Sequence, residues 1–279
     1  MKFVDVTNDV AFRKIFGNEK KTKILISFLN AILKFEGSDR IVQVEIIDPN
    51  QLPRIRGEKA SIIDIRAKDE TGRKFVVEMQ VASVDGFDKR VQYYACREYS
   101  MQIERGEQYP LLRPAFFIGI LDFDFFDSKS YLSHHIIVNG ETLEHKLKDI
   151  QFTFIELRKF KLEMDELETL TEKWVFFIKN AENLEVIPEH VNDDGLMEAY
   201  KEADRYSWNK NEWIAYDNAS IAEQDERGKI IAAEKKAKIE VIEKALNENL
   251  SIDLIARIVG LSIGETTQII AEINKKKSD

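Results

Sequence analysis

The chain has 279 residues, 44% of them apolar and 33% charged, a composition typical of folded globular proteins. This length accommodates one sizeable α/β domain and an appendage. The sequence lacks an apolar run near 18 residues and a signal-type N-terminus, so we expect a cytoplasmic protein with no membrane association. A single Cys96 excludes an intramolecular disulfide and a multi-cysteine zinc site, and we expect its thiol to pack within a helix.

The net charge of −9 argues against a nucleic-acid partner, because Lys and Arg contacts to phosphate dominate such affinity. The charge is, however, unevenly distributed. Residues 1–115 hold 20 Lys and Arg against 17 Asp and Glu, whereas residues 116–279 hold 21 against 33. The first segment, with its net charge of +3, therefore permits weak and salt-sensitive association with DNA, and the acidity belongs to the second segment.

The predicted elements alternate between helices and strands as far as about residue 180. We expect helices over residues 5–17, 23–33, 90–105 and 164–181, and strands over 41–47, 61–67, 74–82, 115–126, 134–138 and 150–157. Everything beyond is predicted to be helical. We expect three parts: a core over residues 1–183, a charged helical extension over 184–249, and a small helix-turn-helix-like module over 250–279.

The two apolar runs around Gly72 predict a β-hairpin, because the residues between them are typical of a turn. We expect the facing pairs to be Lys68 with Lys74, Arg66 with Val76, and Asp64 with Glu78. Since side chains alternate along a strand, Asp64, Arg66, Val76, Glu78 and Gln80 share one face, while Ile63, Ile65, Val77, Met79 and Val81 point into the core.

The facing carboxylates Asp64 and Glu78 repel each other unless a positive charge lies between them. One interpretation is an ordinary hairpin with a polar face exposed to solvent, which is common in antiparallel sheets. The other is a site for a divalent cation such as Mg²⁺, which takes one or two carboxylates together with water and phosphate oxygens. The second interpretation is favoured because Glu78 and Gln80 interrupt a very apolar segment.

The order Asp64, thirteen residues, Glu78, one residue, Gln80 resembles the PD-(D/E)xK nuclease signature in its variant with Gln at the Lys position. Further segments are similar to the recombination-promoting nuclease/transposase (Rpn) family of that superfamily. They are TNDVAFRKIFG at residues 7–17, the following KILISFLNAIL, RVQYYACREYSMQIERGEQY at residues 90–109 and FTFIELRKF at residues 152–160. The resemblance covers nearly the whole chain. Ile63 departs from the signature, since it stands at the position of the usual Pro.

The resemblance implies an α/β fold with a restriction-endonuclease-like core, in which helices flank a mixed sheet, and a helical C-terminal extension. It implies a DNA endonuclease that hydrolyses phosphodiester bonds in recombination or mobile elements and depends on Mg²⁺ or another divalent cation such as Mn²⁺ or Ca²⁺. Asp64 and Glu78 then hold the metal, joined by the Met79 carbonyl, and Gln80 orients the attacking water. The competing hypothesis is a catalytically weak DNA-binding or inhibitory scaffold.

Three further residues are candidates for the site. Arg13 and Arg90 are expected to contact DNA, although Arg90 could equally pair with a neighbouring acid. Asp9 is either an additional acidic residue near the metal or part of a helix cap.

Two alternatives also remain open for the C-terminal helices. Residues 251–273 resemble a helix-turn-helix, with DNA contacts through Thr266, Thr267 and Gln268. A helical hairpin for packing or a homodimer is favoured, because the would-be recognition helix has no Arg or Lys before Lys275. The acidity of the second half suggests that this tail competes with DNA phosphate.

Overall fold

The computed structural model describes residues 2–48, 50–51 and 61–278. Contacts divide the chain into two compact units, Met1–Ala219 and Ser220–Asp279. The long helix α6 (Lys210–Asn247) begins in the first unit and ends in the second. The boundary expected after residue 183 falls inside the first unit, because α5 (Asp194–Ala203) packs closely against α2 (Lys23–Leu33).

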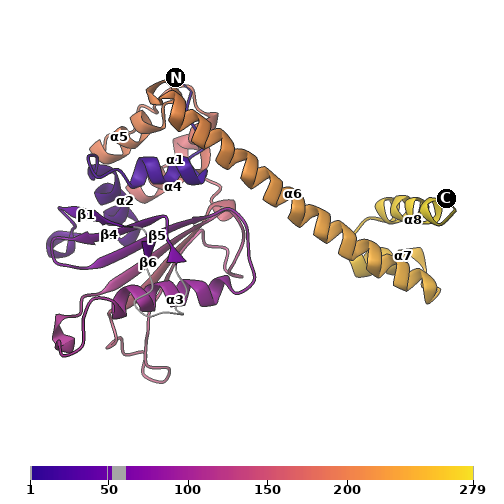
Figure 1. Ribbon diagram of the computed structural model, residues 1–279, viewed down its shortest axis with the longest axis horizontal. Helices are drawn as coiled ribbons and strands as arrows, with labels where there is room; N and C mark the ends of the chain where they lie inside the picture. Colours follow the sequence, from indigo (N-terminus) through magenta and orange to yellow (C-terminus); the bar gives the residue numbers. More distant parts are fainter. Residues whose placement is uncertain (1, 49, 52–60, 279) are drawn as a thin grey trace. The chain divides into compact units, whose positions relative to one another are not determined.

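A mixed six-stranded sheet forms the centre of the first unit, with the order β1-β4-β5-β6-β8-β7 (Figure 1). Its strands are β1 (Val44–Ile47), β4 (Ile65–Asp69), β5 (Lys74–Gln80), β6 (Ala115–Leu121), β7 (Leu132–His135) and β8 (Ile150–Glu156). The central strands β5, β6 and β8 run parallel, and the outer pairings are antiparallel. A separate pair joins β2 (Asn50–Gln51) to β3 (Ser61–Ile62).

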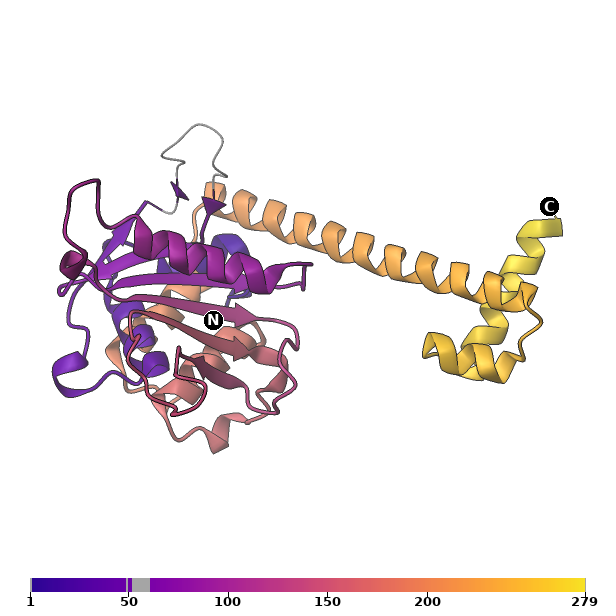
Figure 2. The same cartoon turned by 90° about the horizontal axis from the view of Figure 1, so that it is seen from below.

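Helices cover both faces of this sheet, as Figures 1 and 2 show. One face is covered by α1 (Asp9–Phe16), α2 and α4 (Leu170–Asn180), with α5 packed on α1 and α2, and the other face packs against α3 (Phe87–Ser100). Every residue of β6 is buried, as expected for a strand between two layers. The sheet and its helices form the α/β architecture that the sequence predicts.

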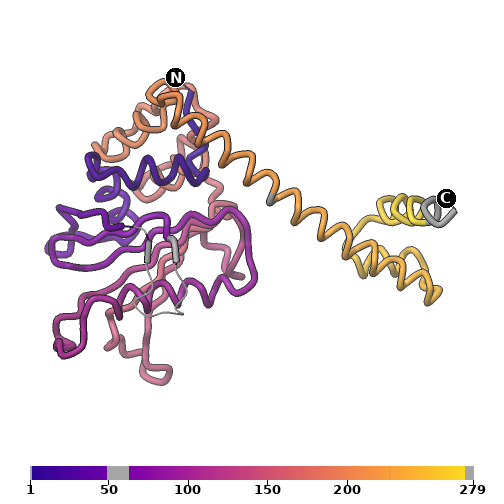
Figure 3. Tube along the Cα trace, viewed as in Figure 1, coloured from indigo at the N-terminus to yellow at the C-terminus, as the bar shows by residue number. Residues whose placement is uncertain are grey.

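The N-terminal segment ties α5 to the rest of the first unit. The Val4 N–H donates to the Ala203 carbonyl at 2.9 Å, and the Arg205 N–H donates to the Lys2 carbonyl at 2.8 Å. Figure 3 traces this N-terminal segment beside the end of α5. Because these bonds and the buried Tyr200 belong to the main core, residues 184–219 are part of the fold that carries the site.

The hairpin has the predicted register, with Arg66 paired to Val76 and Lys68 to Lys74. Two details differ from the expectation. The face with Val76 and Glu78 is not a surface, because α3 covers it. Ile63 packs on that same α3 side and not with Ile65, because the chain bends at Asp64 before β4 begins.

The second unit contains the end of α6, α7 (Ile252–Val259) and α8 (Ile263–Ser278), which share a small apolar cluster around Ile242, Ile255 and Ile273. In the described part of the chain no single helix is long and apolar enough to cross a membrane. The bent pair of α7 with residues 263–273 passes the same test by length and composition only. Thr266 is fully buried and is not available for DNA contact, which weakens the helix-turn-helix alternative, whereas Thr267 and Gln268 are exposed.

Candidate active site

The two predicted carboxylates lie together near the C-terminal end of β5. Glu78 is only 8% exposed, and the Asp64 side chain at the bend before β4 is equally covered. The Asp64 N–H donates to Glu78 Oε2 at 3.4 Å, and the Met79 N–H donates to Asp64 Oδ2 at 2.8 Å. The bend therefore turns the Asp64 carboxylate toward the backbone of β5.

Burial and mutual repulsion make this pair difficult to ionise fully. Burial raises the pKa of Glu78 to about 8, and the charge of Asp64 adds to that rise. Burial also raises the pKa of Asp64 to about 6, although the Met79 N–H and the Arg13 guanidinium oppose the shift. Without a cation the pair thus tends to retain a proton near neutral pH.

Helix α1 places Asp9 and Arg13 beside the pair. Asn8 caps the helix by accepting from the Val10 and Ala11 N–H groups, while Phe12 faces the core. Arg13 lies one turn after Asp9 on the outer face, and its Nη2 is 2.8 Å from Asp9 Oδ1. The Arg13 guanidinium donates through Nε and Nη2 to Asp64 Oδ1, at 3.1 and 2.9 Å.

Gln80, the last residue of β5, is held at both ends of its amide. Arg90 Nη2 donates to Gln80 Oε1, and Gln80 Nε2 donates to the Ala82 carbonyl at 2.8 Å. Arg90 is positioned from α3, where its guanidinium lies 5.3 Å from the Phe87 ring centroid and 6.0 Å from that of Tyr94. The structure therefore pairs Arg90 with Gln80, a partner that the sequence interpretation did not propose.

All six predicted site residues consequently meet at one place, from α1, the bend before β4, the end of β5 and α3. Two neighbouring features escaped the sequence interpretation. Arg66 makes a buried two-pronged ion pair with Glu98 of α3, at 2.8 and 3.1 Å, which fixes that helix over the hairpin. Gly119 lies next to Glu78 on β6, so the neighbouring strand presents no side chain beside the carboxylate.

A comparison with known families agrees with this geometry. The chain matches the family described as PD-(D/E)XK nuclease family transposase over residues 6–233. The chain belongs to this family. Among curated proteins and solved structures, nothing matches it. Membership confirms the fold class and the resemblance to this superfamily, a mixed sheet flanked by helices in a nuclease-like transposase family. The match ends within α6, so the second unit lies mostly outside it.

Nucleases of the PD-(D/E)XK class generally use divalent cations, and the donor set at Glu78 fits such an ion. Carboxylate oxygens are ligands that Mg²⁺ prefers, and two buried carboxyl groups lie together here. Among the described residues, no group of three or more His, Cys, Asp and Glu side chains is arranged to hold a metal. A cation here would therefore depend on the two carboxylates, the backbone and groups from outside the chain.

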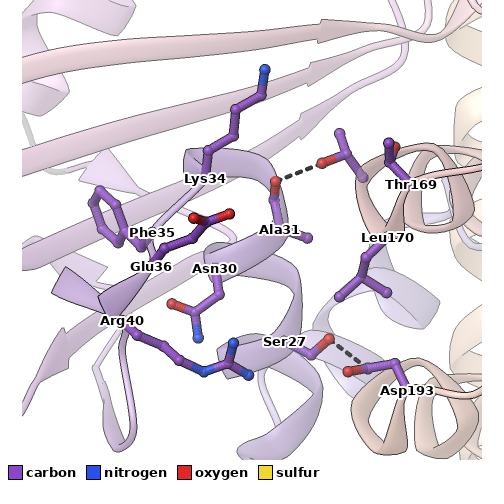
Figure 4. A pocket seen from close by; sticks show the side chains of 11 residues that line it. Ser27, Asn30, Ala31, Lys34, Phe35, Glu36, Arg40, Thr169, Leu170 and Asp193 are labelled. Atoms are coloured by element: carbon purple, nitrogen blue, oxygen red, sulfur yellow. Dashed lines mark hydrogen bonds between the residues drawn. The ribbon is translucent and has the colours of Figure 1, made fainter. Parts of the chain in front are cut away.

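A separate pocket of about 330 Å³ lies between α2 and the start of α4 (Figure 4). Three of its polar side chains take part in hydrogen bonds within the helical layer. Ser27 Oγ donates to Asp193 Oδ1 at 2.6 Å, and Thr171 Oγ1 donates to the Ala31 carbonyl at 2.6 Å. These bonds join α2 to α4 and α5, so we assign this pocket to packing of the helical layer. Cys96 is exposed on α3, in contrast to the packed thiol expected from the sequence.

Proposed function

We propose that this protein is a divalent-metal-dependent DNA endonuclease that acts at Asp64, Glu78 and Gln80. The observation that carries the proposal is the buried carboxyl pair next to the Gln80 amide, which Arg90 and Ala82 hold in place. Membership of a nuclease family supports the reaction class. A role in recombination or mobile elements is part of the same proposal.

Asp64 and Glu78 would hold the cation, with the Met79 carbonyl as a further ligand. When bound, a divalent cation lowers the pKa of a bound water molecule and neutralises negative charge on the phosphate. The cation would bind by displacing the proton that the pair retains, because carboxyl groups hold a metal in their deprotonated form. Asp9 lies within reach of Arg13 and adds to the negative field around Asp64.

Gln80 would orient the attacking water by hydrogen bonding. Because Arg90 and Ala82 fix both ends of its amide, the side chain does not need to be ordered when substrate binds. Gln80 carries no charge, so the other groups must stabilise the charge that develops on the phosphate. Arg13, about half exposed beside Asp64, would contact a phosphate oxygen.

Nicking of supercoiled plasmid with Mg²⁺ or with EDTA tests the proposal. We expect Mg²⁺-dependent nicking by the wild type, and none by Asp64→Asn or Glu78→Gln. Glu141→Gln, which changes an exposed carboxylate, serves as the matched control and should cut like the wild type. Circular dichroism establishes that each variant is folded. Cleavage by either site variant at the wild-type rate would contradict the assignment.

One contact favours the alternative of a weakly active DNA-binding or inhibitory scaffold. Arg13 already neutralises Asp64, so the pair has a counter-charge without a metal ion. Calorimetry with Mg²⁺ on the wild type and on Arg13→Ala separates the two functions. A nuclease binds Mg²⁺ in both proteins, and more tightly in the variant, because the competing guanidinium is gone. A scaffold binds DNA but no Mg²⁺ in either protein.

A further inference from the structure

A second pocket opens directly beside the candidate active site, along the first two turns of α3. Its volume is about 610 Å³, and its lining residues are Val84, Asp85, Gly86, Lys89, Arg90, Tyr93 and Tyr94. Arg90 belongs to both places, since it lines this pocket and donates to Gln80. A molecule in the pocket would therefore lie next to any group bound at Gln80.

The pocket presents an aromatic ring that is fixed in position. Tyr93 is 42% exposed, whereas its neighbour Tyr94 on the same helix is only 9% exposed and packs against the sheet. Its hydroxyl accepts a hydrogen bond from Arg97 Nη1 at 2.7 Å, and the Arg97 guanidinium lies 5.8 Å from its ring centroid. These contacts hold the ring on the surface instead of allowing it to fold onto the helix.

The charges around Tyr93 indicate what the pocket accepts. Lys89 is exposed one turn earlier, and within the described residues it forms no ion pair. Asp85 lines the same pocket and would repel a phosphate placed inside it. A ligand with an uncharged ring and an attached phosphate fits these charges. Its ring would lie against Tyr93 and away from charge repulsion by Asp85, and its phosphate would lie at Lys89.

We propose that this pocket binds one unpaired nucleotide of the DNA strand next to the scissile phosphate. The base stacks on Tyr93, and Lys89 contacts its phosphate. In a continuous duplex the bases are paired and stacked on one another, so Tyr93 could reach only a base that has left the stack. The inference rests on the proposed function and adds a substrate class: DNA with a single-stranded, frayed or gapped segment.

Fluorescence anisotropy of the full chain in EDTA tests the pocket without cleavage. The probes are fluorescein-labelled oligothymidylate and a labelled duplex of the same length. We expect the wild type to bind oligothymidylate more tightly than the duplex. Tyr93→Ala should weaken oligothymidylate binding about 5- to 150-fold, as found for the loss of one base-stacking ring, and leave duplex binding nearly unchanged. Tyr93→Phe keeps the ring and loses only the hydrogen bond from Arg97, so it should weaken oligothymidylate binding much less than Tyr93→Ala does.

Two further variants complete the test. Tyr109→Ala removes a more exposed tyrosine outside the pocket and should have no effect. Lys89→Gln should weaken oligothymidylate binding. It should also reduce the slope of log affinity against log salt concentration by about one, which corresponds to one phosphate contact. Thermal unfolding shows whether each variant is folded, and Lys89→Gln provides a result even if Tyr93→Ala is unstable.

The outcomes separate this inference from the proposed function. Wild-type oligothymidylate affinity in Tyr93→Ala, or equal losses in Tyr93→Ala and Tyr93→Phe, would overturn stacking in the pocket even if plasmid nicking is observed. A clearly larger loss in Tyr93→Ala than in Tyr93→Phe would support the pocket, even if the wild type shows no Mg²⁺-dependent nicking and the proposed nuclease activity fails.

Discussion

The buried Glu78 carboxyl makes the metal-free protein sensitive to pH. Its pKa is about 8 in the folded chain against an ordinary 4.5, so ionisation favours the unfolded state. The stability that the protonated Glu78 contributes to the folded state is fully present below about pH 4.5. It is lost as the pH rises through about 8. In EDTA, we therefore expect the free energy of unfolding to fall over this window.

Glu78→Gln removes the ionisable carboxyl group, so the free energy of unfolding should lose the part of its pH dependence that comes from Glu78. The variant should match the wild type near pH 4.5 and exceed it at pH 8 by more than about 1 kcal/mol, since each pKa unit corresponds to about 1.4 kcal/mol. Urea unfolding of both proteins in EDTA at several pH values measures the difference. A difference that does not change with pH would contradict the assigned pKa shift.

Gln80 gives a second prediction at the residue scale. If its amide orients the attacking water, Gln80→Ala should slow Mg²⁺-dependent cleavage by about 10²–10³-fold, comparable to the loss of one transition-state donor. Mg²⁺ affinity should change little, because Gln80 is not a proposed ligand. Single-turnover nicking and calorimetry measure the two quantities. Gln92→Ala, on the exposed surface of α3, is the matched control. An unchanged rate in Gln80→Ala would make the residue structural.

At the scale of elements, the contact between α2 and α5 depends on one glycine. A methyl group on Gly195 would lie 2.5 Å from the Lys23 carbonyl oxygen and 2.5 Å from Ser27 Cβ. Gly195→Ala should therefore destabilise the protein by about 1–3 kcal/mol, as overpacking does elsewhere. Gly228→Ala in α6 is the control, because a methyl group there meets open space and should stabilise the helix by about 0.5–1 kcal/mol. Chemical denaturation measures the free energy of unfolding of both variants. If it changes equally in the two, close packing at Gly195 is excluded.

The hairpin shows which part of the fold could be predicted from the sequence. Its register follows from the period of two and from the turn at Gly72, both of which are local, so Arg66 and Val76 face each other as predicted. The layer over that face depends on α3, which follows β5 and turns back so that its Phe87, Val91 and Tyr94 pack on the sheet. Local periodicity contains no information about such a contact.

The site was predictable to the same extent. The spacing from Asp64 to Gln80 identified the carboxylates and the amide. It could not reveal that Arg90 holds Gln80 or that Arg66 pairs with Glu98, because these partners lie on another element. The bend at Asp64 also escaped prediction. It rotates Ile63 to the other face and lets Asp64 accept the Met79 N–H.

For the whole molecule, the distribution of charge argues against an acidic competitor that is confined to the second unit. Residues 116–219 hold 11 Lys and Arg against 22 Asp and Glu, whereas residues 220–279 hold 10 against 11. The acidity therefore belongs to the same compact unit as the candidate site. A nearly neutral second unit has little electrostatic means to displace DNA phosphate.

Truncation tests this conclusion, and the fold decides where to cut. A chain that ends near residue 183 would lose α5 and the buried Tyr200, and is expected to unfold. A chain ending at Ala233 keeps the first unit and the whole family match. We expect it to retain its main unfolding transition, Mg²⁺-dependent nicking and unchanged duplex affinity at low salt.

Light scattering on the same shortened protein shows whether α7 and α8 form a homodimer, because their removal would then lower the solution mass. Duplex affinity is measured at an ionic strength of about 0.01 M, where charge screening is weak because the Debye length is about 30 Å. A gain in affinity there would show that the tail does compete with phosphate. A loss of affinity without a change in mass would instead assign DNA contact to residues 234–279, which include the exposed Thr267 and Gln268 of α8.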